Sequence, residues 1–331
     1  MKTFNKFIAG FLASCVMAPA IASAEDINIV LNWVPTADHM PYFYAKQMGL
    51  YEKEGLNVNI ESGRGSGAAA QKVGAGFSQF GIADMPTVLL AKGQGADSVA
   101  LMTVYTNSPQ GFYWLKSKGI KGAEDFPGHS IGNPPADASR VMWPMFAEAV
   151  KIDPAAVKFV NISPQAKVAS LKSGAIDITS DFYNEHDMKV REFGDDLGFL
   201  AWRNIGINPY GNSIIVNANY LNKNPETVRK FMQVTQKAFE TCVKDRDPCI
   251  EALLSQVSGL DKSNQQDQWN RIQELMRDKT TMEVGLGAFD DDRMKQDYEM
   301  VEKYFDLEKP FDIKTAYSNE YLDMSIKMPK E

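Results

Sequence analysis

A polar and aromatic segment, residues 32–44, holds the side chains best suited to binding a small molecule. Asn32, Asp38 and His39 supply hydrogen-bond donors and acceptors, while Trp33 and two tyrosines supply flat faces for stacking. Together these groups favour a planar, nitrogen-rich ligand. The alternative is that some of these aromatic rings only pack between a helix and a sheet.

The order of elements around this segment is typical of a ligand-binding corner. Apolar residues alternate over 27–31, which predicts a strand, and residues 41–48 lie between a proline start and a glycine stop, which predicts a helix. In an open α/β sheet, loops that follow strand ends and precede helices converge at one edge of the sheet. We therefore expect residues 32–40 to face a crevice.

Further along the chain, expected strands and helices alternate, which predicts a largely parallel α/β sheet covered on both faces. The expected strands are 57–61, 80–83 and 99–105, and the expected helices are 67–73 and 85–92. The glycine-rich segment 63–67 lacks the Gly-Lys-Ser/Thr sequence of a phosphate loop. It is better interpreted as a helix N-terminus whose N–H groups and Ser66 hydroxyl can hold a polar group.

The pattern of residues 74–84 recurs at residues 171–181, where a helix again ends and a strand again runs to an aspartate. This repetition predicts two similar α/β lobes. We assign residues 25–115 and 213–331 to lobe 1 and residues 116–212 to lobe 2, with 213–217 as a strand that returns to lobe 1. Two crossings form a hinge, and a hinge between α/β lobes forms a cleft that closes on a ligand.

Residues 225–331 have the periodicity of a helical layer on lobe 1. Apolar residues share one face in each of three stretches: Val228, Phe231, Met232, Thr235 and Phe239; Trp269, Ile272 and Leu275; Met294, Tyr298, Val301 and Phe305. Most of these faces are expected to pack internally, and a minority could dock on a membrane transporter.

The N-terminal residues 1–24 have the pattern of a secretory signal peptide, with lysines at positions 2 and 6, an apolar run and Ala-Ser-Ala before Glu25. The alternative is a lipoprotein signal, in which Cys15 becomes the lipidated first residue. The formal net charge of −7 argues against a nucleic-acid or anionic-membrane partner. In an oxidising compartment, Cys242 and Cys249 are expected to form a disulfide. Three histidines, none of them at ligand spacing, argue against a metal site, and we expect no cofactor.

The chain resembles the periplasmic substrate-binding proteins of ABC transporters, in the group for nitrate, sulfonate, taurine and thiamine precursors. The marks are the signal peptide, LNW at 31–33, GLYEKEGL at 49–56, FGIAD at 80–84 and LKSGAID at 171–177. Residues 33–39 and 181–186 are most similar to the branch that binds formylaminopyrimidine and related thiamine pyrimidines. The resemblance implies a two-lobed fold with a ligand cleft. It also implies a soluble periplasmic monomer that delivers a heterocyclic ligand to a permease in the inner membrane, without chemistry.

The resemblance also assigns candidate ligand contacts. Trp33 is the expected stacking residue, with Phe182 or Tyr183 opposite, and Glu185 corresponds to the family position at the pyrimidine edge. A carboxylate there accepts from an amine, and a protonated carboxyl can pair with a ring nitrogen. The full candidate set is Asn32, Trp33, His39, Asp84, Asn133, Tyr183 and Glu185.

Two alternatives remain open. Ser139 and Arg140, in the loop of residues 131–140, could form a clamp for a sulfonate, taurine or nitrate anion. A pyrimidine-synthesising enzyme shares the fold, but the export signal and the lack of that enzyme's cysteine-rich motif argue against an enzyme.

Overall fold

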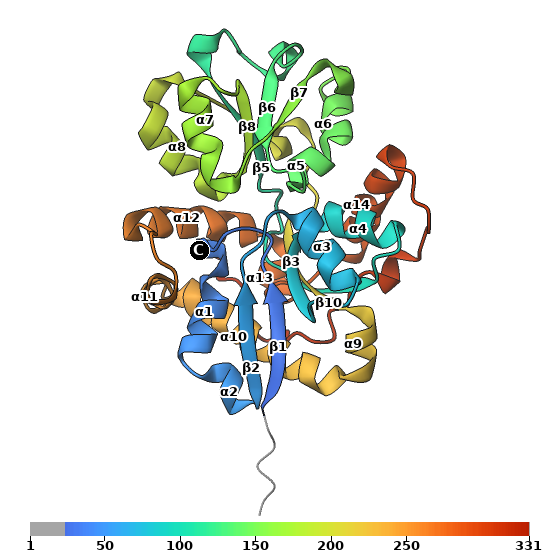
Figure 1. Cartoon of the computed structure of the whole chain (residues 1–331). Coiled ribbons are helices and arrows are strands. Elements are labelled where there is room, and N and C mark those ends of the chain that lie inside the picture. Colours follow the sequence, from blue (N-terminus) through green and yellow to red (C-terminus); the bar gives the residue numbers. More distant parts are fainter. Residues whose placement is uncertain (1–23, 331) are drawn as a thin grey trace, which may run out of the picture.

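Two five-stranded sheets organise residues 24–330, the part of the chain that the computed structural model describes (Figure 1). The predicted signal peptide, with the alternative lipidation site Cys15, lies outside the described residues except for Ala24. Within the described residues, no helix is long and apolar enough to cross a membrane.

The first sheet has the strand order β2-β1-β3-β10-β4. Strands β1, β2 and β3 pair in parallel, and β10 pairs antiparallel with both β3 and β4. Their bounds are β1 Glu25–Val30, β2 Leu56–Glu61, β3 Phe80–Asp84, β4 Ser98–Thr103 and β10 Asn212–Asn217.

The second sheet repeats this plan with the order β7-β6-β8-β5-β9, in which β5 is the antiparallel strand. Its strands are β5 Gln110–Leu115, β6 Ser130–Asn133, β7 Lys158–Asn161, β8 Ile178–Phe182 and β9 Leu197–Ala201. The two-lobed α/β architecture predicted from the internal repetition is therefore confirmed. Both sheets are mixed, because each contains one reversed strand.

The reversed strand of each sheet is the one that has just crossed from the other lobe. Strand β10 returns to the first sheet, as predicted. Strand β5 pairs with β8 and β9 of the second sheet, although the sequence analysis placed residues 110–115 in lobe 1. All six residues of β5 are buried. A fully buried strand has the same sequence pattern in either sheet, so only its strand pairing shows that β5 belongs to lobe 2.

Helices cover both sheets, and the C-terminal ones form a layer on lobe 1 (Figure 1). Lobe 1 carries α1 Met40–Gln47, α2 Leu50–Lys53, α3 Ser66–Gly74 and α4 Met85–Gly93. Lobe 2 carries α5 Ala138–Val141, α6 Trp143–Ala149, α7 Lys167–Ser173 and α8 His186–Phe193. The layer comprises α9 Ala218–Lys223, α10 Pro225–Lys244, α11 Asp247–Gln256, α12 Lys262–Met276, α13 Lys279–Glu283 and α14 Asp291–Tyr304.

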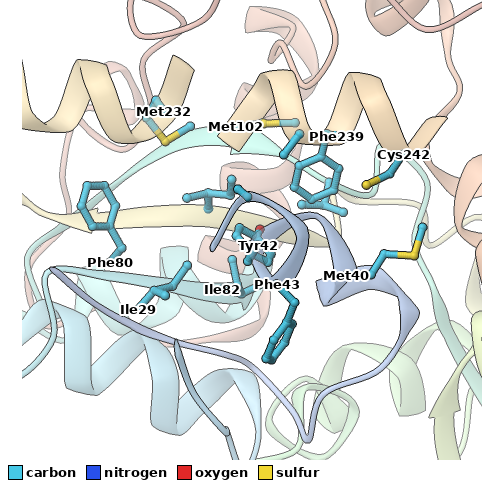
Figure 2. Packing of buried hydrophobic residues seen from close by; sticks show 14 of the residues in the cluster. Ile29, Met40, Tyr42, Phe43, Phe80, Ile82, Met102, Met232, Phe239 and Cys242 are labelled. Atoms are coloured by element: carbon cyan, nitrogen blue, oxygen red, sulfur yellow. The ribbon is translucent and has the colours of Figure 1, made fainter. Parts of the chain in front are cut away.

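The core of lobe 1 lies where α1 and α10 pack against the sheet (Figure 2). Phe80 of β3 stacks on Phe231 of α10 with ring centroids 4.0 Å apart. Tyr42 of α1 meets Phe239 of α10 edge-on at 5.5 Å. The predicted apolar face of α10 is buried throughout, as is that of α12. On α14, Met294 and Val301 are fully buried. Burial of these stripes fixes the helical layer to lobe 1.

The two cysteines that remain after the signal region lie in the buried junction between α10 and α11. Their Cα atoms are 5.8 Å apart and their sulfur atoms lie at bonding distance. This separation lies within the range that a disulfide requires. The geometry is compatible with the disulfide predicted from the sequence.

Replacing Cys242 and Cys249 together with alanine should lower the free energy of unfolding by about 2–3 kcal/mol, because a closed loop restricts the unfolded chain. Urea unfolding of the wild type and the double variant measures the difference. Peptide mapping under non-reducing conditions provides the control, and recovery of both cysteines as free thiols would contradict the pairing.

Candidate functional site

The loop after β1 is held by a short network around His39. The Thr36 backbone N–H donates to His39 Nδ1 at 3.1 Å, so Nδ1 is an acceptor and the ring proton lies on Nε2. Nε2 then donates to Asn32 Oδ1 at 2.9 Å. Burial lowers the pKa of His39, which keeps the ring neutral. His39 thus positions Asn32, and it does not itself line the cavity described below.

Asp38, in the same loop, directs its carboxylate toward the cavity between the lobes. Thr36 Oγ1 donates to one of its oxygens at 2.6 Å, and the Asn212 amide of β10 donates to the other at 3.1 Å. Asp38 is buried and lines the cavity. Two neutral donors hold this carboxylate in place without cancelling its charge.

The cavity lies between the lobes and has a volume of about 440 Å³. Lobe 1 contributes Asn32, Trp33, Thr36, Asp38, Gly65 and Ser66; β5 contributes Gln110; and lobe 2 contributes Asp137, Ala138, Lys167, Asp181, Phe182, Asn184 and Glu185.

The two lobes are in close contact at Gly65, which precedes α3. Its φ is +127°, and a Cβ there would lie 2.2 Å from the carbonyl oxygen of Ala136 in lobe 2. The Gly67 N–H donates to that same oxygen at 3.2 Å. Only glycine therefore fits position 65 in this closed arrangement. The glycine-rich segment serves the closure of the lobes, and Ser66 Oγ accepts from the Asp84 N–H at 3.0 Å.

Lys167, at the start of α7, is the buried cation of the cavity wall. Its ammonium donates to Asp137 at 2.9 Å and to the Ser180 carbonyl at 2.8 Å, and it lies 3.7 Å from Asp181. It also lies 4.4 Å from the ring centroid of Trp33 in the opposite lobe. Burial alone would lower the pKa of Lys167, but the two aspartates offset this and raise it. The ammonium is fully engaged within the protein.

Glu185 lines the cavity from lobe 2, in the short 3₁₀ turn before α8. Burial raises its pKa to about 7. Its Oε1 accepts a hydrogen bond from Gln268 Nε2 of α12 at 3.1 Å. At neutral pH this side chain can therefore present either a carboxylate acceptor or a carboxyl donor.

Of the seven residues predicted as ligand contacts, Asn32, Trp33 and Glu185 meet at the cavity. His39, Asp84, Asn133 and Tyr183 do not line it. Asn133, at the end of β6, is fully buried beside β8 and donates to Ser180 Oγ at 3.2 Å. Tyr183 points outward, where its hydroxyl accepts from Arg271 of α12 at 2.9 Å. Phe182, the alternative stacking partner, lines the cavity instead.

Asp84 lies one layer behind the cavity wall, where Gln110 Nε2 donates to it at 3.3 Å. The proposed anion clamp is also absent from the lining. Ser139 Oγ donates to Asp137, and Arg140 donates to Asn161 Oδ1 at 2.6 Å while its guanidinium packs on Phe159. Arg140 thus turns toward the outer edge of lobe 2.

The cavity also uses residues that the sequence analysis did not select. Asp137, Lys167, Asp181 and Gln110 carry no local motif that separates them from ordinary helix and strand residues. The one sequence signal for Asp181 is its position at the end of the repeated strand pattern, which corresponds to Asp84 in lobe 1. Within residues 24–330, no group of three or more His, Cys, Asp or Glu side chains could hold a metal ion.

This fold, with two sheets joined by two crossings and a cavity between the lobes, is that of the periplasmic binding proteins. The structure resembles a protein from Bordetella bronchiseptica RB50 with a TM-score of 0.75, at 19% identity over 89% of this chain and 95% of that one. It also resembles the periplasmic aliphatic sulphonate binding protein SsuA from Escherichia coli, with a TM-score of 0.63 at 13% identity, over 85% of this chain and 87% of that one. The chain belongs to the NMT1/THI5 like family, whose model matches residues 36–248.

Relatives in sequence carry names of both binding proteins and enzymes. The chain is 23% identical to the formylaminopyrimidine-binding protein of Halalkalibacterium halodurans, over 74% of this chain and 75% of that protein. It is 21% identical to the riboflavin-binding protein RibY of Chloroflexus aurantiacus, over 90% and 86%. It is 23% identical to the 4-amino-5-hydroxymethyl-2-methylpyrimidine phosphate synthase of Legionella pneumophila, over 89% and 92%.

Asp84 should make the protein less stable as the pH rises. Burial raises its pKa from 3.8 to about 8, so the folded state holds a proton that the unfolded state has lost across that window. The free energy of unfolding should then fall between about pH 4 and pH 8, by at most about 1.4 kcal/mol per pH unit for this one group. Asp84→Asn should flatten the fall in thermal melts taken across this range, whereas replacing the exposed Asp26 with asparagine should not.

Lys167→Met should lower the free energy of unfolding by roughly 3–5 kcal/mol, because it leaves Asp137 buried without its cation, while Asp181 retains Lys189. Denaturant titration measures the loss. Lys172→Met on the same helix is the matched control, since Lys172 and Glu192 form an exposed pair and should contribute less than about 1 kcal/mol. Equal losses in the two variants would show that the buried cation has no special role.

Proposed function

We propose that this chain is the solute-binding component of an ABC importer, and that it captures an aminopyrimidine precursor of thiamine in the periplasm and delivers it unchanged to a permease. The ligand is a planar heterocycle of the formylaminopyrimidine or hydroxymethylpyrimidine type. Its ring lies in the cavity against Trp33, and its amino edge meets Glu185.

The observation that carries this proposal is the charge of the cavity. Among the described residues that line it are four carboxylates, Asp38, Asp137, Asp181 and Glu185, and one ammonium, Lys167. The ammonium is bound to Asp137 and a carbonyl. Lys189 donates to Asp181 from outside the lining, so Asp38 and Glu185 are the lining carboxyl groups that have only neutral donors. An anionic ligand would meet these two acidic groups and, among the described lining residues, no free cation. A ring that carries an amine would meet acceptors, so the cavity favours aminopyrimidine over sulfonate or nitrate.

The shape of the cavity supports the same class of ligand. Trp33 and Phe182 line the cavity from opposite lobes. In the proposed complex a planar ring lies between these two side chains, which cover its apolar faces. Asn32 and Asp38 lie at the lobe 1 side, where they can bind polar groups at the ring's margin.

The names of two relatives support a nitrogen heterocycle as the ligand. One relative is named for formylaminopyrimidine binding and another for riboflavin binding. Riboflavin therefore belongs in any ligand panel. The synthase names among the relatives make the enzyme the rival function. Mass spectrometry of the compound released from the protein separates the two, because a binding protein returns its ligand unchanged.

Trp33→Ala should weaken binding of an aromatic ligand by roughly 1–3 kcal/mol, since it removes the stacking face and apolar burial. Glu185→Gln should keep the shape of the site but replace an acceptor with a donor. It should therefore reduce the preference for 4-amino-5-hydroxymethyl-2-methylpyrimidine over the analogue that lacks the amine. Calorimetric titration of both compounds into the wild type and the two variants measures these effects.

Arg140→Ala is the control that separates the pyrimidine from the anion. Because Arg140 is bound to Asn161 outside the cavity, this variant should bind aminopyrimidine like the wild type. If the wild type instead binds a sulfonate or nitrate, and Arg140→Ala abolishes that binding while Glu185→Gln leaves pyrimidine affinity unchanged, the anion function replaces the one proposed here.

A further inference from the structure

Helix α12 of the C-terminal layer faces lobe 2 across the mouth of the cavity. Its buried face, with Trp269 and Ile272, anchors the helix to lobe 1. Its other face runs beside α8 of lobe 2 (Figure 1). Gln268 and Arg271, one turn apart, bind different residues of lobe 2 from this helix. Neither lines the cavity.

The side-chain amide of Gln268 has only one orientation that satisfies both of its partners. Its Oε1 accepts from the backbone N–H of Ala37 at 3.2 Å, and this donor cannot be reversed. The amide nitrogen must then face Glu185, whose Oε1 accepts from it at 3.1 Å. Ala37 belongs to lobe 1 like α12, so the amide is oriented before the lobes close. Gln268 is buried, which shields both bonds from water.

We propose that Gln268 is a specificity-determining positioning residue, which binds one oxygen of the Glu185 carboxyl so that the other oxygen is presented to the ligand. Because Gln268 can only donate to Glu185, any proton on that carboxyl is directed to Oε2. Oε2 then accepts from a ligand amine when Glu185 is ionised, and donates to a ring nitrogen when it is protonated. This inference rests on the proposed function of the same cavity, and it adds α12 to the groups that select the ligand.

The arrangement also explains why a helix so distant in sequence belongs to the site. Glu185 moves with lobe 2, whereas Gln268 and Ala37 are fixed on lobe 1. Gln268 can therefore bind and orient the Glu185 carboxyl group only when the lobes are closed. A ligand that forms a hydrogen bond with Glu185 Oε2 binds more tightly in the closed state than in the open state. This difference in affinity favours closure.

Arg271 provides a matched comparison on the same face of α12. Its guanidinium forms two hydrogen bonds with Asp187, at 2.8 and 3.0 Å, and a third with the Tyr183 hydroxyl. These partners also belong to lobe 2, but they lie outside the cavity. Arg271 therefore contributes to closure without orienting a ligand-facing group.

The experiment compares the wild type with Gln268→Met and Arg271→Met. Calorimetry gives the Kd of each protein for 4-amino-5-hydroxymethyl-2-methylpyrimidine and for the analogue without the 4-amino group. Gln268→Met should reduce the ratio of the two affinities by about tenfold, which is the effect of losing one hydrogen bond to a charged group. Arg271→Met should weaken both compounds equally and leave the ratio unchanged.

The outcomes separate this inference from the proposed function. If the wild type discriminates between the two compounds and Gln268→Met retains the full ratio, or weakens both compounds equally as Arg271→Met does, Gln268 has no role in specificity and the inference fails alone. A wild type that binds neither compound refutes the proposed function and, with it, this inference. Circular dichroism of each variant confirms that the fold is intact.

Discussion

Both lobes depend on a strand that arrives from the other lobe. Strand β5 lies between β8 and β9, and β10 lies between β3 and β4, so each crossing strand is paired on both of its edges. Buried backbone groups must be hydrogen-bonded, and this fixes both ends of each crossing. The crossing segments are also joined to each other, because the Gly211 N–H donates to the Tyr105 carbonyl at 2.8 Å. The two crossings thus form one paired connection between the lobes, and the cavity lies beside it where Gln110 begins β5.

The charged groups of the cavity follow from the same closure. Lys167 of lobe 2 lies against Trp33 of lobe 1, and its partners Asp137 and Asp181 are satisfied within lobe 2. Lys189 completes the network by donating to Asp181 at 2.7 Å. A ligand therefore meets a wall whose charges are already paired, together with Asp38 and Glu185, which have neutral donors. Preorganised acceptors of this kind recognise donors without a large reorganisation on binding.

The sequence predicted the parts of this molecule that depend on local pattern. Strand ends and their repetition indicated two lobes, and the polar aromatic loop after β1 indicated Trp33 and Asn32. Local pattern could not separate side chains at the cavity from those one layer behind it. His39 and Asn133 are polar and follow strands, but His39 is held by Thr36 and Asn32 of its own loop, and Asn133 is held by Ser180 of the neighbouring strand. Lys167 and Gln268 have the spacing of ordinary helix residues, and only the packing of distant elements gives them their places.

The polar contacts that join the lobes outside the cavity do not hold them closed by themselves. Arg271 and Asp187 are each about one quarter exposed, and ion pairs with that degree of exposure contribute about 0–1 kcal/mol. The pair of Arg191 with Asp267 is more exposed still. Closing the lobes also moves Glu185 out of water, which costs free energy if the carboxyl is ionised. Under the proposed function, an amine that donates to Glu185 would offset this cost, whereas a ligand without a donor would not. Binding of the proposed ligand and closure of the lobes would then be coupled through this one carboxyl group.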